Sequence, residues 1–378
     1  MISRLIENQI LNALKPGKVI GLFGARQTGK TVLMEKIKTR ISGSVLLVHG
    51  ENLDAQEILS SQRTSLLKRF SQGYEYLFID EAQEIPHIGV NLKLLVDTLP
   101  SLGIFVTGSS AFNLKTKIGE PLVGRSRYFH LYPLSILELQ KQQDYLTLKD
   151  DLESILIWGQ YPQVVTEPDI KERKLILEGI RDGYLLKDIL ELDNLKNSLF
   201  IFNLLRLLAF QIGKDISYSE LAQNLNSNKK TVMRYLDLLD KSFVLFALPG
   251  FSRNLRKEYT RSPRYFFWDN GVRNSVISNY NSISVRDDIG MLWENFCITE
   301  RIKANEYQNR SPNRYYWRTY DQKEIDYIEE SDGKLSAFEF KWVKNKIKTP
   351  QEFLNTYHHS RFQLVNKGNY LDFVAPSA

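Results

Sequence analysis

The stretch from Val19 to Thr31 (VIGLFGARQTGKT) holds the residues whose types and spacing most clearly indicate chemistry. Its second part fits the phosphate-binding loop pattern G-x-x-x-x-G-K-[ST] at every fixed position. In such a loop, glycines let backbone N–H groups point at the β-phosphate, the lysine attracts the β- and γ-phosphates, and the last hydroxyl joins the Mg²⁺ shell. The sequence therefore predicts a site for ATP and Mg²⁺ formed by Gly24, Ala25, Arg26, Gln27, Thr28, Gly29, Lys30, Thr31 and Val32.

A second candidate set is the acidic pair Asp80 and Glu81, which ends the apolar stretch Tyr76–Ile79. A nucleotide hydrolase with this loop needs carboxylates opposite it. Asp80 is suited to hold Mg²⁺ through water, and Glu81 to polarise the attacking water as a general base. Many strands end in acidic turns, so the pair alone says little. Its place after a complete phosphate-binding loop favours the catalytic interpretation.

Two further groups are candidates for contact with the γ-phosphate. The apolar strand Ile104–Val106 ends in small hydroxyl residues. In AAA+ ATPases the strand beside the acidic one ends in a polar residue that senses the γ-phosphate. Either Thr107 or Ser109 could be this residue. The alternative is that they form a turn after a core strand. Arg125 or Arg127 would act as an arginine finger on a neighbouring subunit, which requires a homo-oligomer. The alternative is that the two arginines form a solvated surface pair.

The C-terminal third contains a second constellation, formed by Glu294, Asp326, Glu339 and Lys341. Glu294 is expected on a helix and Asp326 on a strand. Glu339 and Lys341 share one face of the next strand, because side chains alternate along a strand. This order resembles the PD-(D/E)XK nuclease superfamily. The resemblance implies Mg²⁺ held by Asp326 and Glu339, with Lys341 activating water and Glu294 completing the outer shell. The alternative is a sheet whose carboxylates and lysine merely pair.

Basic residues gather in a segment with helix-turn-helix order. Ser219–Leu225 is expected to form a short helix, Lys230–Leu239 a second helix, and Phe243–Leu248 the strand of a wing. Basic side chains at the start of the second helix and in the following loop suit DNA groove or phosphate contacts. Winged helices also serve as inert lids or protein contacts, so both interpretations stay open. The candidate DNA-binding residues are Lys229, Lys230, Arg234, Arg253, Arg256 and Lys257.

Several motifs in a fixed order resemble a large prokaryotic family of AAA+-like ATPases with a C-terminal domain of unassigned function. The resemblance covers nearly the whole chain and implies an ATPase core, a helical lid, a winged helix and a nuclease-like C-terminal fold. It also favours a functional role for Gln83. The motifs are GARQTGKT, YLFIDEAQEIP, FVTGSSAFNL, GRSRYFHLYPLSILEL, WGQYPQVV, YLLKDIL, YSELAQNLNSNKKTVMRYLDLLDKSFVLFALP and YFFWDNGVRN.

The elements that must position these residues follow from length and hydrophobic patterning. A chain of 378 residues is longer than a domain with a single hydrophobic core, so we expect more than one domain. We expect an α/β fold: a P-loop AAA+-like core over residues 1–134, a helical lid over 135–212, a winged helix-turn-helix over 213–264, and a small α/β nuclease-like domain over 265–378. The strand Val19–Phe23 and the helix Val32–Ile41 flank the phosphate-binding loop.

Composition sets further limits. The net charge of +6 permits DNA as a partner without arguing for it. The single cysteine, Cys297, excludes an intramolecular disulfide and, with no apolar signal core at the N-terminus, predicts a cytoplasmic protein. No apolar run reaches membrane-spanning length, so no membrane partner is expected.

Three functional hypotheses follow. The first is a Mg²⁺-dependent ATPase that couples ATP hydrolysis to DNA binding or remodelling. The second is a slow nucleotide-dependent switch or scaffold that contacts protein partners, and the third is an ATP-gated, metal-dependent DNA nuclease. The first is favoured.

Overall fold

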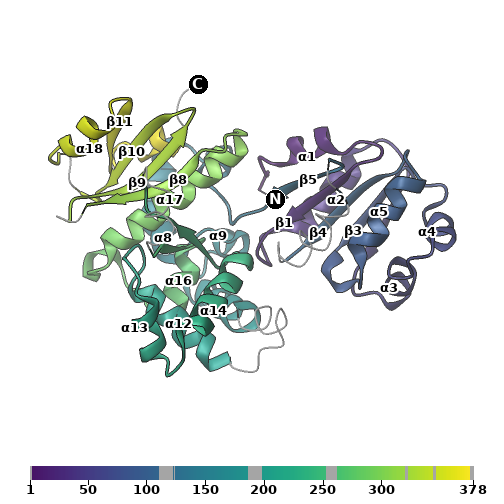
Figure 1. The fold of residues 1–378 in the computed structure, drawn as a ribbon, viewed down its shortest axis with the longest axis horizontal. Helices are drawn as coiled ribbons and strands as arrows, with labels where there is room; N and C mark the ends of the chain where they lie inside the picture. The colour runs from purple at the N-terminus through teal and green to yellow at the C-terminus, as the bar shows by residue number, and fades with distance from the viewer. Residues whose placement is uncertain are drawn as a thin grey trace. The chain divides into compact units, whose positions relative to one another are not determined.

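The computed structural model describes residues 2–109, 122, 124–185, 198–252, 262–319, 322–343 and 346–374, with backbone alone at 184 and 185. These residues form two compact units (Figure 1). Unit 1 comprises Met1–Pro133 and Lys241–Phe243, and unit 2 comprises Leu134–Asp240 and Val244–Ala378. The predicted lid and C-terminal domain fall in unit 2, as does the predicted winged helix apart from Lys241–Phe243.

Unit 1 is built on a parallel sheet with strand order β2-β3-β4-β1-β5. Because the strands run parallel, their C-terminal ends lie at one edge. Strand β4 separates β1 from β3, so the ends of these three strands are neighbours at that edge. The strands are β1 (Val19–Phe23), β2 (Val45–His49), β3 (Tyr76–Asp80), β4 (Gly103–Gly108) and β5 (Ser126–His130).

Helices connect these strands and cover the sheet (Figure 1). The central strands β1, β3 and β4 are almost entirely buried, which explains their continuous apolar sequences. Leucine and isoleucine side chains of α5 complete this core. The helices are α1 (Glu7–Ala13), α2 (Lys30–Arg40), α3 (Leu53–Leu59), α4 (Thr64–Ser71), the short 3₁₀ helix η1 (Ala82–Glu84) and α5 (Ile88–Thr98).

Unit 2 begins with a run of helices and continues into an antiparallel strand pair. Helix α13 (Tyr218–Asn224), a short turn and helix α14 (Lys229–Lys241) precede β6 (Leu245–Leu248), which pairs with β7 (Arg264–Phe267). The preceding helices are α7 (Ile136–Leu139), α8 (Tyr145–Trp158), α9 (Pro162–Thr166), α10 (Ile170–Ile180), the π-helical turn η2 (Arg181–Leu185) and α12 (Ser198–Phe210).

The C-terminal part of unit 2 is a four-stranded sheet of order β11-β10-β9-β8. Strands β8, β9 and β10 are antiparallel neighbours, and β11 runs parallel to β10. The long helix α17 packs against β10. The elements are α16 (Asn270–Val276), η3 (Ile283–Val285), α17 (Ile289–Tyr307), β8 (Asn313–Arg318), β9 (Glu324–Ser331), β10 (Lys334–Phe340), α18 (Gln351–Thr356), β11 (Ser360–Val365) and α19 (Tyr370–Val374).

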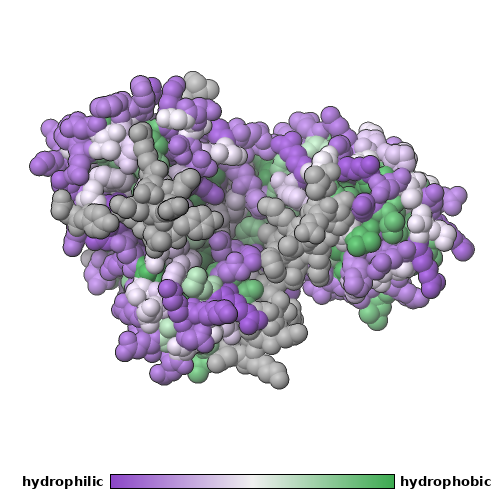
Figure 2. Space-filling model, viewed as in Figure 1, coloured by the Kyte–Doolittle hydropathy of each residue, from purple (hydrophilic) through white to green (hydrophobic). Residues whose placement is uncertain are grey.

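Apolar side chains collect in the cores, and the face drawn in Figure 2 is mostly hydrophilic with small apolar patches. No helix in the described parts of the chain combines the length and apolar character that a membrane span requires.

Candidate functional site

The phosphate-binding loop joins β1 to α2 and depends on its two glycines. A Cβ on Gly24 would stand 2.1 Å from the carbonyl oxygen of Leu131, so only glycine fits there. Gly29 has a φ of 96° and is the N-cap of α2, a backbone conformation that glycine adopts without strain. N–H groups in the first turn of a helix have no partner within the helix, so the first turn of α2, which contains Lys30 and Thr31, suits an anion at the loop.

Lys30 is buried inside this loop. Its Nζ donates hydrogen bonds to the carbonyl oxygens of Gly24 at 3.0 Å and Ala25 at 3.1 Å. Within the loop, the hydroxyl of Thr28 donates to Ala25 at 2.7 Å. The ammonium group is thus held within the loop, and its contact with a β- or γ-phosphate stays a prediction. Of the other predicted contact residues, Arg26 and Gln27 lie in the loop, and Val32 lies on α2 with its side chain half exposed.

Arg4 is a contributor that sequence reasoning missed. Its buried guanidinium donates to the carbonyl oxygen of Thr28 at 2.7 Å and to that of Tyr132 at 2.6 Å. It therefore ties the phosphate-binding loop to the segment that follows β5. No local pattern marks this residue, since its partners lie 24 and 128 positions away.

Asp80 sits at the centre of a hydrogen-bonded set of oxygen groups. Its Oδ2 accepts from the Thr31 hydroxyl at 2.8 Å, and its Oδ1 accepts from the Thr107 hydroxyl. The Thr107 hydroxyl in turn accepts from the backbone N–H of Glu81 at 3.1 Å. Strand order explains this meeting, because β4 carries Thr107 between the loop strand and the acidic strand. Carboxylate and hydroxyl oxygens at this spacing suit Mg²⁺, which prefers hard oxygen ligands. His49 adds a third side-chain neighbour, with its Nδ1 3.6 Å from Asp80 Oδ2.

Glu81 follows Asp80 in a left-handed backbone conformation, with φ 49° and ψ 49°. Such a conformation is uncommon for a residue other than glycine and is often found at functional sites. Its carboxylate accepts a hydrogen bond from the side-chain amide of Gln83 at 2.6 Å. The same amide lies 3.2 Å from the hydroxyl of Ser109. The two γ-phosphate sensor candidates thus differ: Thr107 contacts Asp80, and Ser109 contacts Gln83.

Arg125 and Arg127 lie away from this loop. Ser126 of β5 pairs with Val19 at the start of β1, so both arginines are near the edge opposite to the phosphate-binding loop. Arg125 forms an exposed ion pair with Asp97, and the Arg127 guanidinium lies 4.9 Å from the ring centre of Phe129. The contacts that the structure describes for them do not reach the loop of their own chain. An arginine finger that acts on a neighbouring subunit stays a prediction.

Unit 2 brings together the predicted C-terminal constellation. Glu294 lies on α17, Asp326 on β9 and Glu339 on β10, and Lys341 follows the end of β10. Lys341 Nζ is 2.7 Å from Glu339 Oε1 and 3.8 Å from Asp326 Oδ2. Asp326 also accepts from the backbone N–H of Phe340 at 2.8 Å. Lys341 was predicted as part of the strand, which instead ends one residue earlier.

The electrostatics of this cluster follow from its burial. Burial, together with the charge of Asp326, raises the pKa of Glu294 well above its usual range. Burial also raises the pKa of Asp326, and with the charge of Asp326 it raises the pKa of Glu339 to about 7. Burial lowers the pKa of Lys341, but the charges of Asp326 and Glu339 outweigh this effect and raise it. The Oε1 atom of Glu294 is buried and has no hydrogen-bond partner among the residues that the structure describes.

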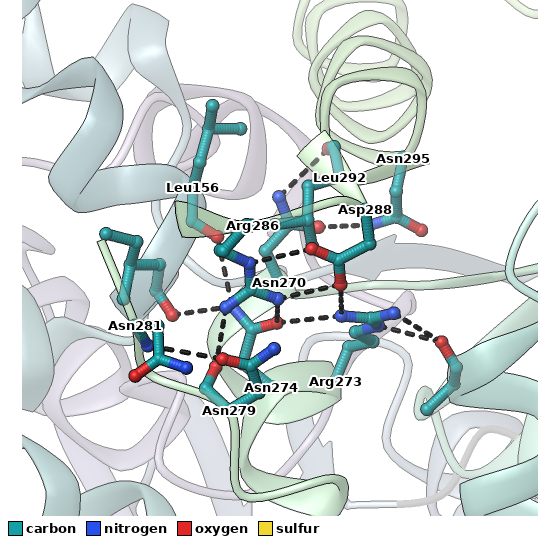
Figure 3. A network of polar contacts seen from close by, with 12 residues as sticks. Leu156, Asn270, Arg273, Asn274, Asn279, Asn281, Arg286, Asp288, Leu292 and Asn295 are labelled. Atoms are coloured by element: carbon teal, nitrogen blue, oxygen red, sulfur yellow. Dashed lines mark hydrogen bonds and ion pairs between the residues drawn. The ribbon is translucent and has the colours of Figure 1, made fainter. Parts of the chain in front are cut away.

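A buried polar network fixes the start of α17, which carries Glu294 (Figure 3). Asp288, the residue before α17, accepts from both Arg273 and Arg286. The side-chain amide of Asn270 donates to the carbonyl oxygen of Leu292 at 3.0 Å. These bonds lock the first turn of α17 against α16, so the position of Glu294 depends on Asn270 and Arg273 of the motif YFFWDNGVRN and on Arg286, which no motif contains.

Arg264, expected among the basic residues of the loop after the wing strand, instead lies next to the C-terminal carboxylates. It lies on β7, is buried, and donates to Asp215 and Glu324 at 2.9 Å each. Burial lowers the pKa of Arg264, but the charge of Glu294 and the hydrogen bonds to Asp215 and Glu324 outweigh this effect and raise the pKa. Arg264 therefore places a permanent positive charge beside the carboxylates. Within the described parts of the chain, no group of three or more His, Cys, Asp or Glu side chains is placed to hold a metal ion.

The predicted DNA-binding residues are only partly described. Lys229, Lys230 and Arg234 have exposed side chains on the first turns of α14. Arg253, Arg256 and Lys257 lie outside the described residues.

Comparison with known families divides the chain into three matched regions. Residues 16–140 match the model of the AAA domain. They form an AAA-like ATPase domain. Residues 149–282 match a domain of unknown function (DUF8612), and residues 289–371 match another (DUF4143). Neither description mentions a winged helix or a nuclease, so those two identifications stay predictions.

Relatives of the chain occur in bacteria and archaea. An uncharacterized protein of Mycobacterium tuberculosis is 27% identical, over 88% of this chain and 72% of its own length. An uncharacterized protein of Methanocaldococcus jannaschii is 24% identical, over 86% of this chain and 75% of its own.

Two solved structures are similar in part. The Walker-type ATPase PABY2304 of Pyrococcus abyssi has a TM-score of 0.49 at 15% identity, covering 73% of this chain and 96% of its own. The Holliday junction branch migration motor RuvB of Thermotoga maritima has a TM-score of 0.31 at 18% identity, covering 65% of this chain and 89% of its own.

Proposed function

We propose that this protein is a Mg²⁺-dependent ATPase that couples ATP hydrolysis to DNA binding or remodelling through unit 2. The observation that carries the hydrolytic part is the hydrogen-bonded set of Thr31, Asp80, Thr107 and the Glu81 backbone. It joins the ends of β3 and β4 to the first turn of α2. This arrangement supports turnover rather than nucleotide binding alone, because it sets a second carboxylate, Glu81, next to the metal-binding groups.

The residues of unit 1 divide the work of hydrolysis. N–H groups of the loop and Lys30 bind the β- and γ-phosphates. Thr31 and Asp80 would hold Mg²⁺, which neutralises charge on the phosphates when bound. Glu81 accepts the proton of the attacking water, and Thr107 keeps Asp80 and the Glu81 backbone in place. Arg125 or Arg127 of a neighbouring subunit would complete the site in a homo-oligomer.

The DNA part of the proposal is supported by the surface chemistry of unit 2. Lys229, Lys230 and Arg234 present cations along the start of α14, the second helix of a helix-turn-helix pair. A helix placed this way can enter the major groove while its cations contact phosphates. The paired strands β6 and β7 follow α14 as a wing would.

A second candidate function is cleavage of DNA at the C-terminal cluster. Two observations favour it: Lys341 contacts both Asp326 and Glu339, and the buried Oε1 of Glu294 has no hydrogen-bond partner in the described parts of the chain. Asp326 and Glu339 would hold a divalent metal ion, which takes its other ligands from water or a substrate phosphate. Lys341 would stabilise charge on that phosphate.

One experiment separates these functions. ATP hydrolysis is measured for the wild type and Lys30→Ala, with Mg²⁺ and with single-stranded, duplex or branched DNA, and the same DNA is then run on a gel. We expect hydrolysis that is lost in Lys30→Ala and rises with one DNA structure. An equal rate on all DNA would refute the coupling. Tight nucleotide binding with little turnover and no salt-sensitive DNA affinity would instead indicate a switch or scaffold.

Cleavage is scored on the same gel. Strand breaks with Mg²⁺ or Mn²⁺ that disappear in Asp326→Ala support the nuclease. Intact DNA with both metals, or cleavage that Asp326→Ala leaves unchanged, refutes it.

A further inference from the structure

The side chain of Gln83 links the predicted base to the end of a different strand. Its amide nitrogen lies 2.6 Å from Glu81 Oε2 and 3.2 Å from the hydroxyl of Ser109. A carboxylate oxygen only accepts hydrogen bonds, so the contact with Glu81 fixes which end of the amide points toward it. Gln83 therefore bridges η1, which follows β3, and the residue that follows β4.

The other end of the amide packs against the backbone of β4. A Cβ on Gly108, the last residue of β4, would stand 2.9 Å from Gln83 Oε1. This oxygen is buried and has no hydrogen-bond partner among the described residues. A buried acceptor without a partner is unfavourable and persists where the surrounding structure requires it. The amide is thus confined between the Glu81 carboxylate, Ser109 and the backbone of β4.

We infer that Gln83 is a positioning residue that fixes the Glu81 carboxylate for proton abstraction. A glutamate side chain has several rotatable bonds, and a base works only when its carboxylate is held within reach of the water. The amide of Gln83 supplies that restraint. The inference deepens the proposed ATPase function and rests on it.

The bond to Ser109 adds a link to the γ-phosphate. Strand β4 lies directly between β1, which leads into the phosphate-binding loop, and β3, which leads into Glu81. A γ-phosphate in the loop would therefore approach the end of β4. Any shift of Ser109 toward it is transmitted to Glu81 through one shared amide. The alignment of the base thus depends on whether the third phosphate is present.

The test replaces Gln83 by methionine, which has a similar length and shape but no hydrogen-bond donor. We expect Gln83→Met to lower kcat by about tenfold or more, while KM and ATP affinity change by less than about twofold. Gln72→Met, at an exposed glutamine of the same unit, is the matched control and should leave both constants unchanged. An unchanged or raised kcat in Gln83→Met would overturn the inference.

A double-mutant cycle then shows whether Gln83 acts through Glu81. Glu81→Gln removes the base, so adding Gln83→Met to it should change the residual rate by less than about twofold. Effects that multiply in the double variant would mean that Gln83 acts independently, which contradicts the positioning role. Ser109→Ala should lower kcat less than Gln83→Met and add little to it. Absence of hydrolysis in the wild type would reject the proposed ATPase, whereas an active wild type with a fully active Gln83→Met rejects this inference alone.

Discussion

Thr107→Val tests the hydrogen-bonded set around Asp80 directly. Valine keeps the shape of threonine but removes the hydroxyl that donates to Asp80 and accepts from the Glu81 N–H. Thr107 is fully buried, so water cannot replace either bond. A bond to a charged group contributes about 2 kcal/mol and a neutral one about 1 kcal/mol, so the loss in unfolding free energy is about 3 kcal/mol. In a domain of this size this lowers the midpoint of thermal unfolding by about 10 °C.

The assay uses the uneven distribution of tryptophan. Every tryptophan of the chain lies in unit 2: Trp158, Trp268, Trp293, Trp317 and Trp342. Fluorescence therefore follows unit 2, while far-ultraviolet circular dichroism follows both units. We expect Thr107→Val to lower the dichroism transition of unit 1 and leave the fluorescence transition unchanged.

Thr107→Ser is the matched control, because it keeps the hydroxyl and loses one methyl group, worth about 1 kcal/mol. It should retain most of the ATPase rate, whereas Thr107→Val should lower kcat by at least about tenfold. Equal stability and equal rates in the two variants would refute the assigned role of the hydroxyl.

The remaining predictions concern the loop glycine and the C-terminal carboxylates. Gly24→Ala should abolish ATP binding measured by calorimetry without unfolding unit 2, because its Cβ would collide with Leu131; normal affinity would contradict this. Glu294 has a raised pKa when folded, so its stability contribution is lost as pH rises above about 4.5. The stability of Glu294→Gln relative to the wild type, measured by tryptophan fluorescence, should therefore be higher at about pH 8 than at about pH 5. The same difference at both pH values would contradict a raised pKa of Glu294. Because the pKa of Glu339 is about 7, Mn²⁺ affinity should rise as pH increases through 7; a flat profile would argue against binding there.

Local sequence patterns predicted those parts of the site that are contiguous in the chain. The loop Gly24–Thr31 and the pair Asp80 and Glu81 have the residue types that their chemistry needs within a few positions. The separate roles of Thr107 and Ser109 required the strand order, because only the structure shows which neighbour each hydroxyl meets.

The other site residues could not be predicted from local patterns, because their contacts join residues far apart in the sequence. Arg125 was a candidate for the γ-phosphate of a neighbouring subunit, and the parallel register of β5 places it near the opposite edge of its own sheet, so a role in a neighbouring site stays a prediction. Arg4 and Arg264 contact residues far away in the sequence, and no short motif encodes such contacts. The C-terminal set was predictable because alternation along β10 and the hairpin with β9 bring Asp326, Glu339 and Lys341 together.

ATP turnover by Glu81→Gln tests the central claim most directly. The substitution keeps the size of the side chain and removes its capacity to act as a base. The account predicts that ATP affinity stays within about threefold of the wild type while the hydrolysis rate falls about a hundredfold or more. Hydrolysis by Glu81→Gln at the wild-type rate would contradict the account.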